Sequence, residues 1–264
     1  MKLKEFDRPH YEINPIFEVI CQLRFHTILK ISEPPVSFQD KIRNEYPDYR
    51  LDPVVPDGVF PMFIGASEVQ HRFVSEDGVW QVLLAKDNIS LTNFGGYTSF
   101  EDFSCRLDAI LDAFDSEYSP SAYSRIGLRY RNLIARSVFP QIKSLEWKKL
   151  IPEYIAPELH DGNIGESKVY GFEKKIILQE DNEKINVFHV LQKMSGELHG
   201  TEFEDELAYI IDIDSYTEEK INDRNILRNA VQSFKQNIQN IFRYSISDEL
   251  HSALGRTNSR KDKI

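Results

Sequence analysis

The clearest pattern in the chain is an alternation of apolar and polar residues from Asn14 to Phe25. Phenylalanine, valine, cysteine and leucine recur on one side of this segment, while Glu18, Gln22 and Arg24 lie on the other side with two isoleucines. A period of two residues is typical of a strand that buries one face. The same pattern predicts further strands at 69–74, 79–84, 89–94, 123–133, 169–178, 184–191 and 206–214.

The spacing of apolar residues changes to three and four residues at 99–114 and at 222–244, which predicts two long amphipathic helices. Ser99 is expected to cap the first of them, because a serine hydroxyl at this position can accept from the backbone of the third residue along, here Asp102. Shorter helices are expected at 37–46, 145–155 and 248–254, and an irregular segment with three prolines at 49–65.

These elements predict an α+β protein in which one or more antiparallel sheets pack against helices. The order strand, helix, three strands, helix occurs twice along the chain. The tripeptide Leu23-Arg24-Phe25 recurs as Leu128-Arg129-Tyr130, and the acidic hairpin turn at 75–78 recurs at 179–182. The two offsets agree within one residue, which favours an internal duplication. The alternative is that hairpin turns attract acidic residues, glycine and asparagine in any case.

The duplication hypothesis divides the chain into two similar halves and a tail. Their expected bounds are 1–118 for the first α+β half, 119–254 for the second, and 255–264 for a flexible basic tail.

The net charge of the chain indicates which kind of binding partner it favours. The formal net charge is −10. The last nine residues hold four basic residues and one aspartate, so the other residues hold 28 basic against 41 acidic side chains. A body this acidic repels phosphate backbones, which disfavours nucleic acid as a partner. The same charge suits a protein partner with a basic surface.

The apolar runs indicate the cellular location of the protein, and the cysteine spacing indicates the redox state of its thiols. No apolar run approaches the ~20 residues that a membrane-spanning helix needs. The segment Met1 to Arg8 has no apolar signal core, so we expect a cytoplasmic protein without a membrane partner. Cys21 and Cys105 have no partner at metal-binding spacing, and both are expected to be reduced, buried thiols.

Four segments, taken in order, resemble a sporadically distributed bacterial family of uncharacterised function. They are 14–25, Arg125 to Tyr130, Ile211 to Tyr216, and the end of the last long helix near 242–246. The resemblance implies no catalytic residue and no cofactor, because the family has no established activity. Its patchy distribution indicates mobile genes, which are often components of defence or toxin–antitoxin systems.

The best candidate site in the sequence is an arginine face. The chain contains no phosphate-binding loop, zinc-protease motif or nucleophile elbow, and no cofactor is expected. Clustered guanidinium groups can instead bind phosphate or carboxylate in a bidentate manner. The alternative is ordinary pairing with the acidic residues Asp212, Asp214 and Glu18 of other strands. The candidate ligand-binding residues are Arg125, Arg129 and Arg131 on one side of a strand, with Arg24, Gln22 and Glu18 on the corresponding strand of the first half.

Two weaker patterns concern metals. Asp212 and Asp214 share one side of a strand and could bind a divalent cation. Asp161 followed by Glu173-Lys174-Lys175 is similar to a metal-dependent nuclease pattern. Glutamate-x-lysine is common by chance, and the acidic body disfavours a nuclease.

Two functional hypotheses follow. The first is a non-enzymatic binding protein with a protein partner, an accessory or neutralising component of a bacterial defence or toxin–antitoxin module. The second is an anion-binding protein or a metal-dependent phosphoryl-type or nuclease-type enzyme that uses the arginine face and the acidic strand residues. Helix 222–244 also offers a surface for a homodimer, if its apolar side is not covered.

Overall fold

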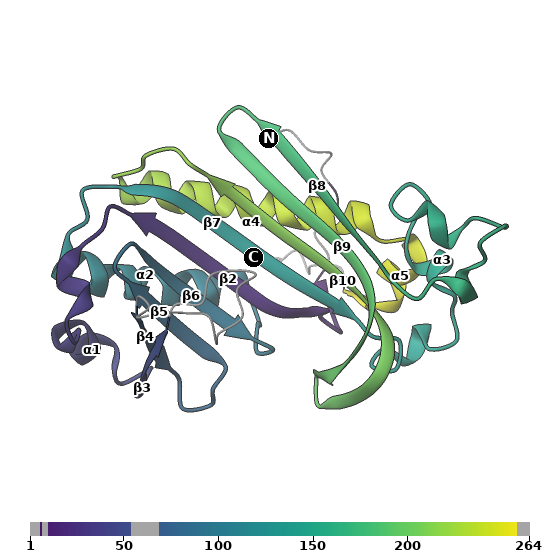
Figure 1. Cartoon of the computed structure of the whole chain (residues 1–264), viewed down its shortest axis with the longest axis horizontal. Coiled ribbons are helices and arrows are strands. Elements are labelled where there is room, and N and C mark those ends of the chain that lie inside the picture. Colours follow the sequence, from purple (N-terminus) through teal and green to yellow (C-terminus); the bar gives the residue numbers. More distant parts are fainter. Residues whose placement is uncertain (1–5, 7–9, 54–68, 258–264) are drawn as a thin grey trace, which may run out of the picture. The chain divides into compact units, whose positions relative to one another are not determined.

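A computed structural model describes residue 6, residues 10–53 and residues 69–257. The sheet strands are β2 (Ile16–Phe25), β3 (Asp48–Pro53), β4 (Val69–Val74), β5 (Trp80–Ala85), β6 (Asn88–Phe94), β7 (Tyr123–Ile134), β8 (Phe172–Glu180), β9 (Glu183–Leu198) and β10 (Thr201–Thr217). The α-helices are α1 (Val36–Ile42), α2 (Phe100–Tyr118), α3 (Trp147–Leu150), α4 (Arg224–Ser245) and α5 (Asp248–Ala253). Within the described residues the strand order is β3-β4-β5-β6-β2-β7-β10-β9-β8 (Figure 1). An antiparallel sheet with helices confirms the predicted α+β class.

The chain forms two compact units, and each unit uses segments that are far apart in the sequence. Unit 1 contains Met1–Phe17, Arg129–Tyr216 and Gln232–Ile264, and unit 2 contains Glu18–Leu128 and Thr217–Val231. Each unit therefore draws on residues from both sides of position 118. The internal duplication stays a prediction.

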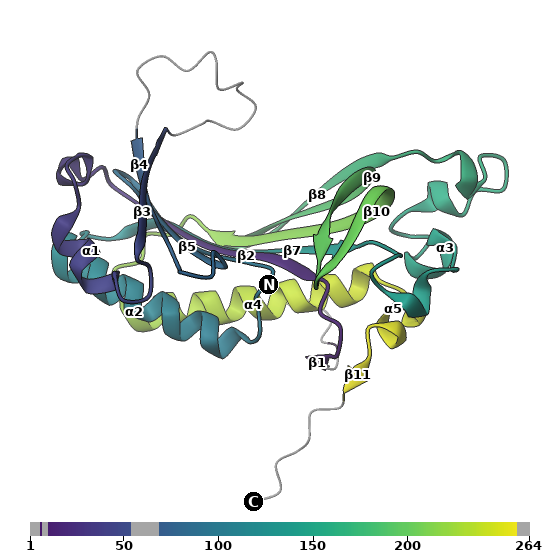
Figure 2. The ribbon, with the colours of Figure 1, turned by 90° about the horizontal axis from the view of Figure 1, so that it is seen from below.

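Unit 2 packs α1 and α2 against one face of its strands (Figure 2). The predicted alternation in β2 is confirmed, since Val19, Cys21 and Leu23 are fully buried. Aromatic rings fill the space between sheet and helices. The ring pairs are Phe25–Phe114 at 4.9 Å, Phe38–Phe73 at 5.5 Å and Trp80–Phe103 at 5.8 Å between centroids.

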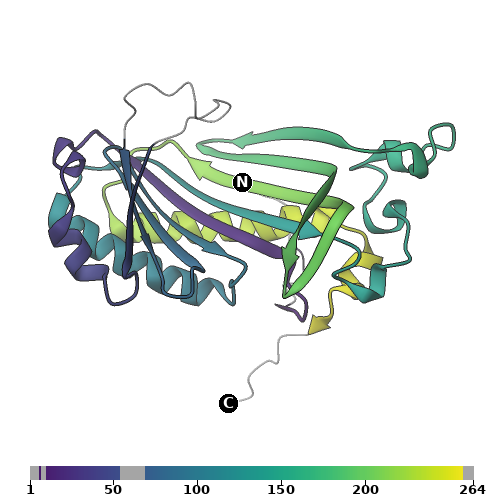
Figure 3. The same ribbon diagram turned by 60° about the horizontal axis from the view of Figure 1, so that its bottom comes forward.

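Unit 1 contains a hairpin that is longer than the sequence pattern predicts. β9 and β10 continue through a region that we expected to be a connection, and they bend together (Figure 3). His199 and Gly200 both have positive φ, 53° and 73°, which suits a tight two-residue hairpin turn. The side chains of this extension are mostly exposed, so no buried face marked it in the sequence.

Helix α4 buries its predicted apolar side. Phe234 and Ile238 are 0% and 1% exposed. The carboxylate of Glu183 in β9 accepts hydrogen bonds from the side chains of Ser233 (3.0 Å) and Asn237 (3.2 Å). The apolar side of this helix is therefore covered within the chain, and the surface predicted for a homodimer is not exposed there.

Two predictions of local structure are wrong. The helix expected at 145–155 is only the four residues of α3, because Pro152 disfavours the helical region for Ile151, which has φ −114° and ψ 126°. The segment expected to be irregular from residue 49 begins as strand β3, which pairs with β4 through all six residues. Its proline, Pro53, stands at the end of the strand, where it interrupts little pairing. Residues 54–65 of that prediction lie outside the described residues.

The predicted cap of α2 is confirmed, since the Ser99 hydroxyl accepts from the backbone N–H of Asp102 at 3.1 Å. We expect Ser99→Ala to lower the free energy of unfolding by about 1 kcal/mol, because it leaves an N–H of the first turn without this acceptor. Urea denaturation measures the change. Ser99→Asp is the matched variant and should keep most of the stability, because aspartate also caps helices; an equal loss in both variants would contradict a capping role.

The C-terminal residues form a small second sheet. β11 (Arg256–Thr257) pairs with β1 (His10–Tyr11) in antiparallel orientation. The rest of the predicted basic tail, 258–264, lies outside the described residues. Among the helices that the structure describes, none has the length and apolar character needed to cross a bilayer.

Candidate functional site

Two arginines of the predicted arginine face meet one buried aspartate in unit 1. Asp212 in β10 is 6% exposed. Arg129 in β7 donates to both of its oxygens, from Nε at 2.7 Å and from Nη2 at 2.5 Å. Arg131 approaches the same carboxylate, with Nε 3.5 Å from Oδ2, and its guanidinium lies 4.8 Å from the ring centroid of Phe17. The ion-pair interpretation is therefore confirmed for Asp212.

The remaining residues of the arginine face lie in unit 2. Arg24 is exposed and donates from Nε to the side-chain oxygen of Gln22 at 3.2 Å. Arg125 folds over Gly127, where a Cβ atom would stand 2.8 Å from the Arg125 Nη1. Glu18 is 7% exposed and faces Phe94 of β6 in the register. Their role in ligand binding stays a prediction.

Two of the acidic residues considered for metals, Asp212 and Asp161, have other contacts. Asp212 is held by Arg129, as described above. The Asp161 carboxylate accepts from the backbone N–H groups of Asn163 (2.7 Å) and Ile164 (3.0 Å), which lowers its pKa and closes a turn. Among the described residues there is no group of three or more histidine, cysteine, aspartate or glutamate side chains arranged to hold a metal ion.

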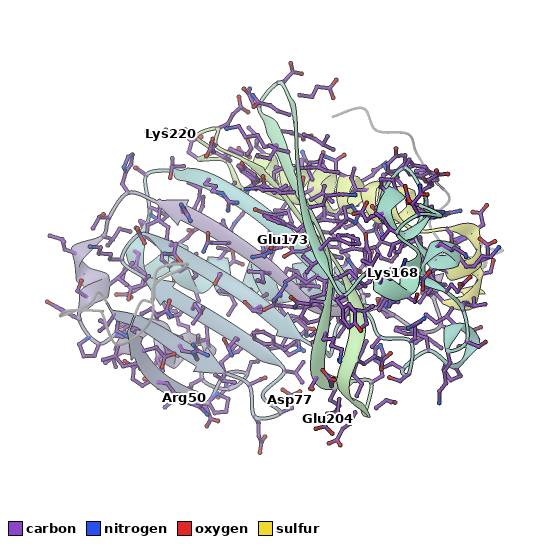
Figure 4. All side chains as sticks on the ribbon, turned by 45° about the vertical axis from the view of Figure 1, so that its right-hand side comes forward. Arg50, Asp77, Lys168, Glu173, Glu204 and Lys220 are labelled. Carbon is purple, nitrogen blue, oxygen red and sulfur yellow. The ribbon has the colours of Figure 1, made fainter. Side chains whose placement is uncertain are left out.

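The structure adds a site in unit 2 that the sequence did not suggest. A surface cavity of about 730 Å³ lies between the end of α1, the β4–β5 turn and the first half of α2. Figure 4 labels one of its residues, Asp77, in that turn. The charged and aromatic side chains that line the cavity, named here the acidic pocket, are Glu45, Glu76, Asp77, Trp80, Asp102 and Arg106.

Arg106 is the centre of the acidic pocket. Its guanidinium lies 4.5 Å from the ring centroid of Trp80, a distance typical of a cation–π contact. It also forms ion pairs with Glu45 at 3.3 Å and with Asp102 at 3.2 Å. These three contacts fix the guanidinium, so it does not extend into the cavity as a free cation.

The other two carboxylates belong to the β4–β5 turn. The Ser75 hydroxyl (2.5 Å) and the backbone N–H of Val79 (3.0 Å) donate to Asp77 and lower the pKa of its carboxyl. Glu76 is exposed. Since the lining side chains include one guanidinium and four carboxylates, the acidic pocket has an excess of negative charge and suits a cationic group.

Cys105 also lines this cavity and is exposed, so the expectation of two buried thiols is wrong for Cys105, although Cys21 is buried. The physical reason is helical geometry. Cys105 follows the buried Phe103 by two residues, or about 200° around the helix, and therefore points away from the apolar side.

One sequence signal could have found part of the pocket. Asp102, Arg106 and Ala109 are spaced by four and three residues, which places them on one face of α2 opposite the buried stripe. No local pattern could join this face to the end of α1 and the β4–β5 turn, because the lining residues of those segments lie 22 to 65 residues before it in the sequence.

Comparison with known proteins gives no assignment. No protein-family model matches the chain, and a search of curated proteins finds no match.

Proposed function

We propose that this chain is a non-enzymatic binding protein whose partner is a protein with basic side chains. The observation that carries the proposal is the acidic pocket of unit 2, which is lined by four carboxylates and by one guanidinium that two of them already pair with. A lysine or arginine side chain of a partner would gain attraction from Glu76 and Asp77 without displacing Arg106. The cavity volume of about 730 Å³ lies within the range of ligand sites and can accept such a side chain of the partner.

The charge of the whole chain supports the same partner. Residues 1–255 hold 41 acidic and 28 basic side chains. This excess of negative charge accelerates association with a basic surface and disfavours association with acidic proteins. It also disfavours nucleic acid as the partner, because a phosphate backbone would be repelled.

The resemblance to a sporadically distributed bacterial family extends this proposal to a biological setting. In that setting the chain is the accessory or neutralising component of a defence or toxin–antitoxin module, and the basic partner is the other component. The acidic pocket supports the choice of a basic partner, whereas the setting depends on the resemblance.

The test uses the tagged full-length chain, purified from its native host at physiological salt, with mass spectrometry of the proteins that copurify. We expect a stoichiometric basic protein. Its dissociation constant should increase about tenfold for Glu45→Gln/Glu76→Lys, because three charge units are changed at the pocket and each exposed charge contributes about 0.5 kcal/mol.

The matched control is Glu33→Lys/Asp40→Asn, which makes the same change of three charge units at exposed positions of unit 2 outside the pocket. Its dissociation constant should change by less than about threefold, because a distant charge acts only through the screened field. Equal weakening in both variants would place the partner elsewhere, and the absence of any stoichiometric protein would contradict the proposal as a whole.

A further inference from the structure

Arg106 of α2 is held in the acidic pocket in the way that a bound guanidinium ligand would be held. Its Cζ atom lies 4.5 Å from the ring centroid of Trp80, so the guanidinium covers the indole. Two different nitrogens donate to two different carboxylates, Nε to Asp102 at 3.2 Å and Nη1 to Glu45 at 3.3 Å. One planar cation is therefore contacted by a ring from β5, by a carboxylate from the segment after α1 and by a carboxylate from α2.

This set of contacts matches the shape of a guanidinium group. Its N–H groups point outward in one plane, where they can reach separate carboxylates, while its flat face stacks on an aromatic ring. An ammonium group has no flat face to lay on the indole, so it gains less from the same three neighbours. The geometry around Trp80 is therefore selective for a guanidinium.

The second tryptophan of the chain shows the same contact in a closed setting. The guanidinium of Arg136 lies 5.0 Å from the ring centroid of Trp147, and its Nη1 donates to the backbone carbonyl of Leu145. Trp147 is 1% exposed. Trp80 and Arg106, in contrast, both line a cavity of about 730 Å³, from which a ligand can approach.

The ion pairs that hold Arg106 are weak enough to be replaced. The side chains of Glu45 and Asp102 are 58% and 42% exposed, and that of Arg106 is 31% exposed. Water and salt screen ion pairs at this exposure, so each contributes little. The same ring and carboxylates can therefore accept a guanidinium from another molecule when the Arg106 side chain is absent.

We propose that the acidic pocket contains a guanidinium-binding subsite, formed by Trp80, Glu45 and Asp102, and that Arg106 fills this subsite as an internal ligand. Arg106 then determines the specificity of the pocket. It closes the subsite to arginine side chains of other proteins and leaves the carboxylates of the β4–β5 turn for a partner. The inference extends the proposed function of this pocket, but its test uses a small cation and succeeds or fails independently of any protein partner.

Titration of Arg106→Ala with methylguanidinium tests the subsite by NMR of the full-length, ¹⁵N-labelled chain. The chain has two tryptophans, so the indole N–H signals of Trp80 and Trp147 report on the subsite and on an internal reference. We expect the Trp80 signal to shift and saturate with a dissociation constant on the order of 10 mM, while the Trp147 signal stays in place. In the wild type the Trp80 signal should not shift, because Arg106 already occupies the subsite.

Two small molecules and two variants complete the test. Urea is planar but neutral and should cause no shift, and methylammonium should bind at least about fivefold more weakly than methylguanidinium. Arg43→Ala is the matched control, because it removes an exposed arginine that pairs with Asp40 at 3.6 Å, and it should behave as the wild type does. Arg106→Gln tests the same subsite if the alanine variant loses the wild-type Trp147 signal.

Two results would overturn the proposal. One is an equal shift of the Trp80 signal in the wild type and in the Arg106 variants, which would mean that Arg106 does not fill the subsite. The other is no shift in a folded Arg106 variant at about ten times the expected dissociation constant, which would mean that Trp80 and the two carboxylates do not bind a guanidinium.

Discussion

Arg129→Ala is expected to lower the free energy of unfolding by about 3 kcal/mol. The substitution removes the two hydrogen bonds that Arg129 donates to Asp212, at 2.7 and 2.5 Å. The carboxylate that remains is 6% exposed, and Arg131 lies 3.5 Å from it. A buried charge that loses its main partner typically costs 3–5 kcal/mol, and the nearby second arginine places the expected value at the lower end. Urea denaturation measures the loss as a decrease in the midpoint.

Arg24→Ala is the control for this prediction. Arg24 belongs to the same predicted arginine face but is exposed and donates to the neutral Gln22 side chain. Its removal should change the free energy of unfolding by less than about 0.5 kcal/mol. The double variant Arg129→Met/Asp212→Leu should recover most of the stability that Arg129→Ala loses, because an apolar pair then replaces the buried carboxylate and its partner.

The same experiment separates the two functional hypotheses from the sequence. If Arg129→Ala keeps its stability and loses an increase in melting temperature that phosphate or a carboxylate produces in the wild type, the arginine face is a ligand site. A large loss of stability without any ligand effect supports a structural ion pair, and function must then be sought in the acidic pocket.

The second large effect is the pH dependence of the free energy of unfolding that the buried His189 of β9 causes. This side chain is 1% exposed, and burial lowers its pKa to about 4, with a smaller contribution from the charge of Lys174. The hydroxyl of Tyr209 lies 3.2 Å from its Nδ1. Histidine in the unfolded chain has a pKa near 6.5, so the unfolded state binds the proton first as the pH falls. Between pH 6.5 and pH 4 the native state should lose about 3 kcal/mol through this group.

His189→Gln removes the titration while it keeps a polar group beside Tyr209. The free energy of unfolding is measured in urea at intervals from pH 7 to pH 4 for both proteins. The carboxylates titrate in both, so their contribution cancels in the difference between the two curves. We expect the wild type to lose about 3 kcal/mol more than His189→Gln over this range, whereas the exposed His26→Gln should follow the wild type. Parallel curves for wild type and His189→Gln would contradict the neutral, buried state of His189.

The sequence predicted the elements whose own residues carry the information. β2 and α2 have apolar residues at a period of two and of three to four, and burial in the structure follows those periods. The cap at Ser99 and the turn at 75–78 depend on neighbours within five residues, so they too could be predicted from the sequence. The effect of Pro152 on Ile151 is also a local signal in the sequence. The helix expected at 145–155 was therefore an error of interpretation.

Other features needed contacts between distant segments. β3 is charged and short, and only its pairing with β4 makes it a strand. The extension of the β9–β10 hairpin exposes most of its side chains, so pairing between backbones holds it without a hydrophobic pattern. Alternation also placed Phe17 on the apolar face, whereas it is only half-buried and lies beneath Arg131.

By itself, the sequence determined the fold class, the buried faces and the acidic balance, because periodicity and charge are properties of neighbouring residues and of the total composition. The tertiary structure decided which charges meet. It placed Arg129 on Asp212, 83 residues away, and it brought Glu45 and Asp102 to Arg106 in a cavity that Glu76 also lines. Among the strands that the structure describes, it also placed β8 at one end of the sheet. Electrostatic energy depends on distances in space, and a chain that folds back on itself sets those distances independently of separation in the sequence.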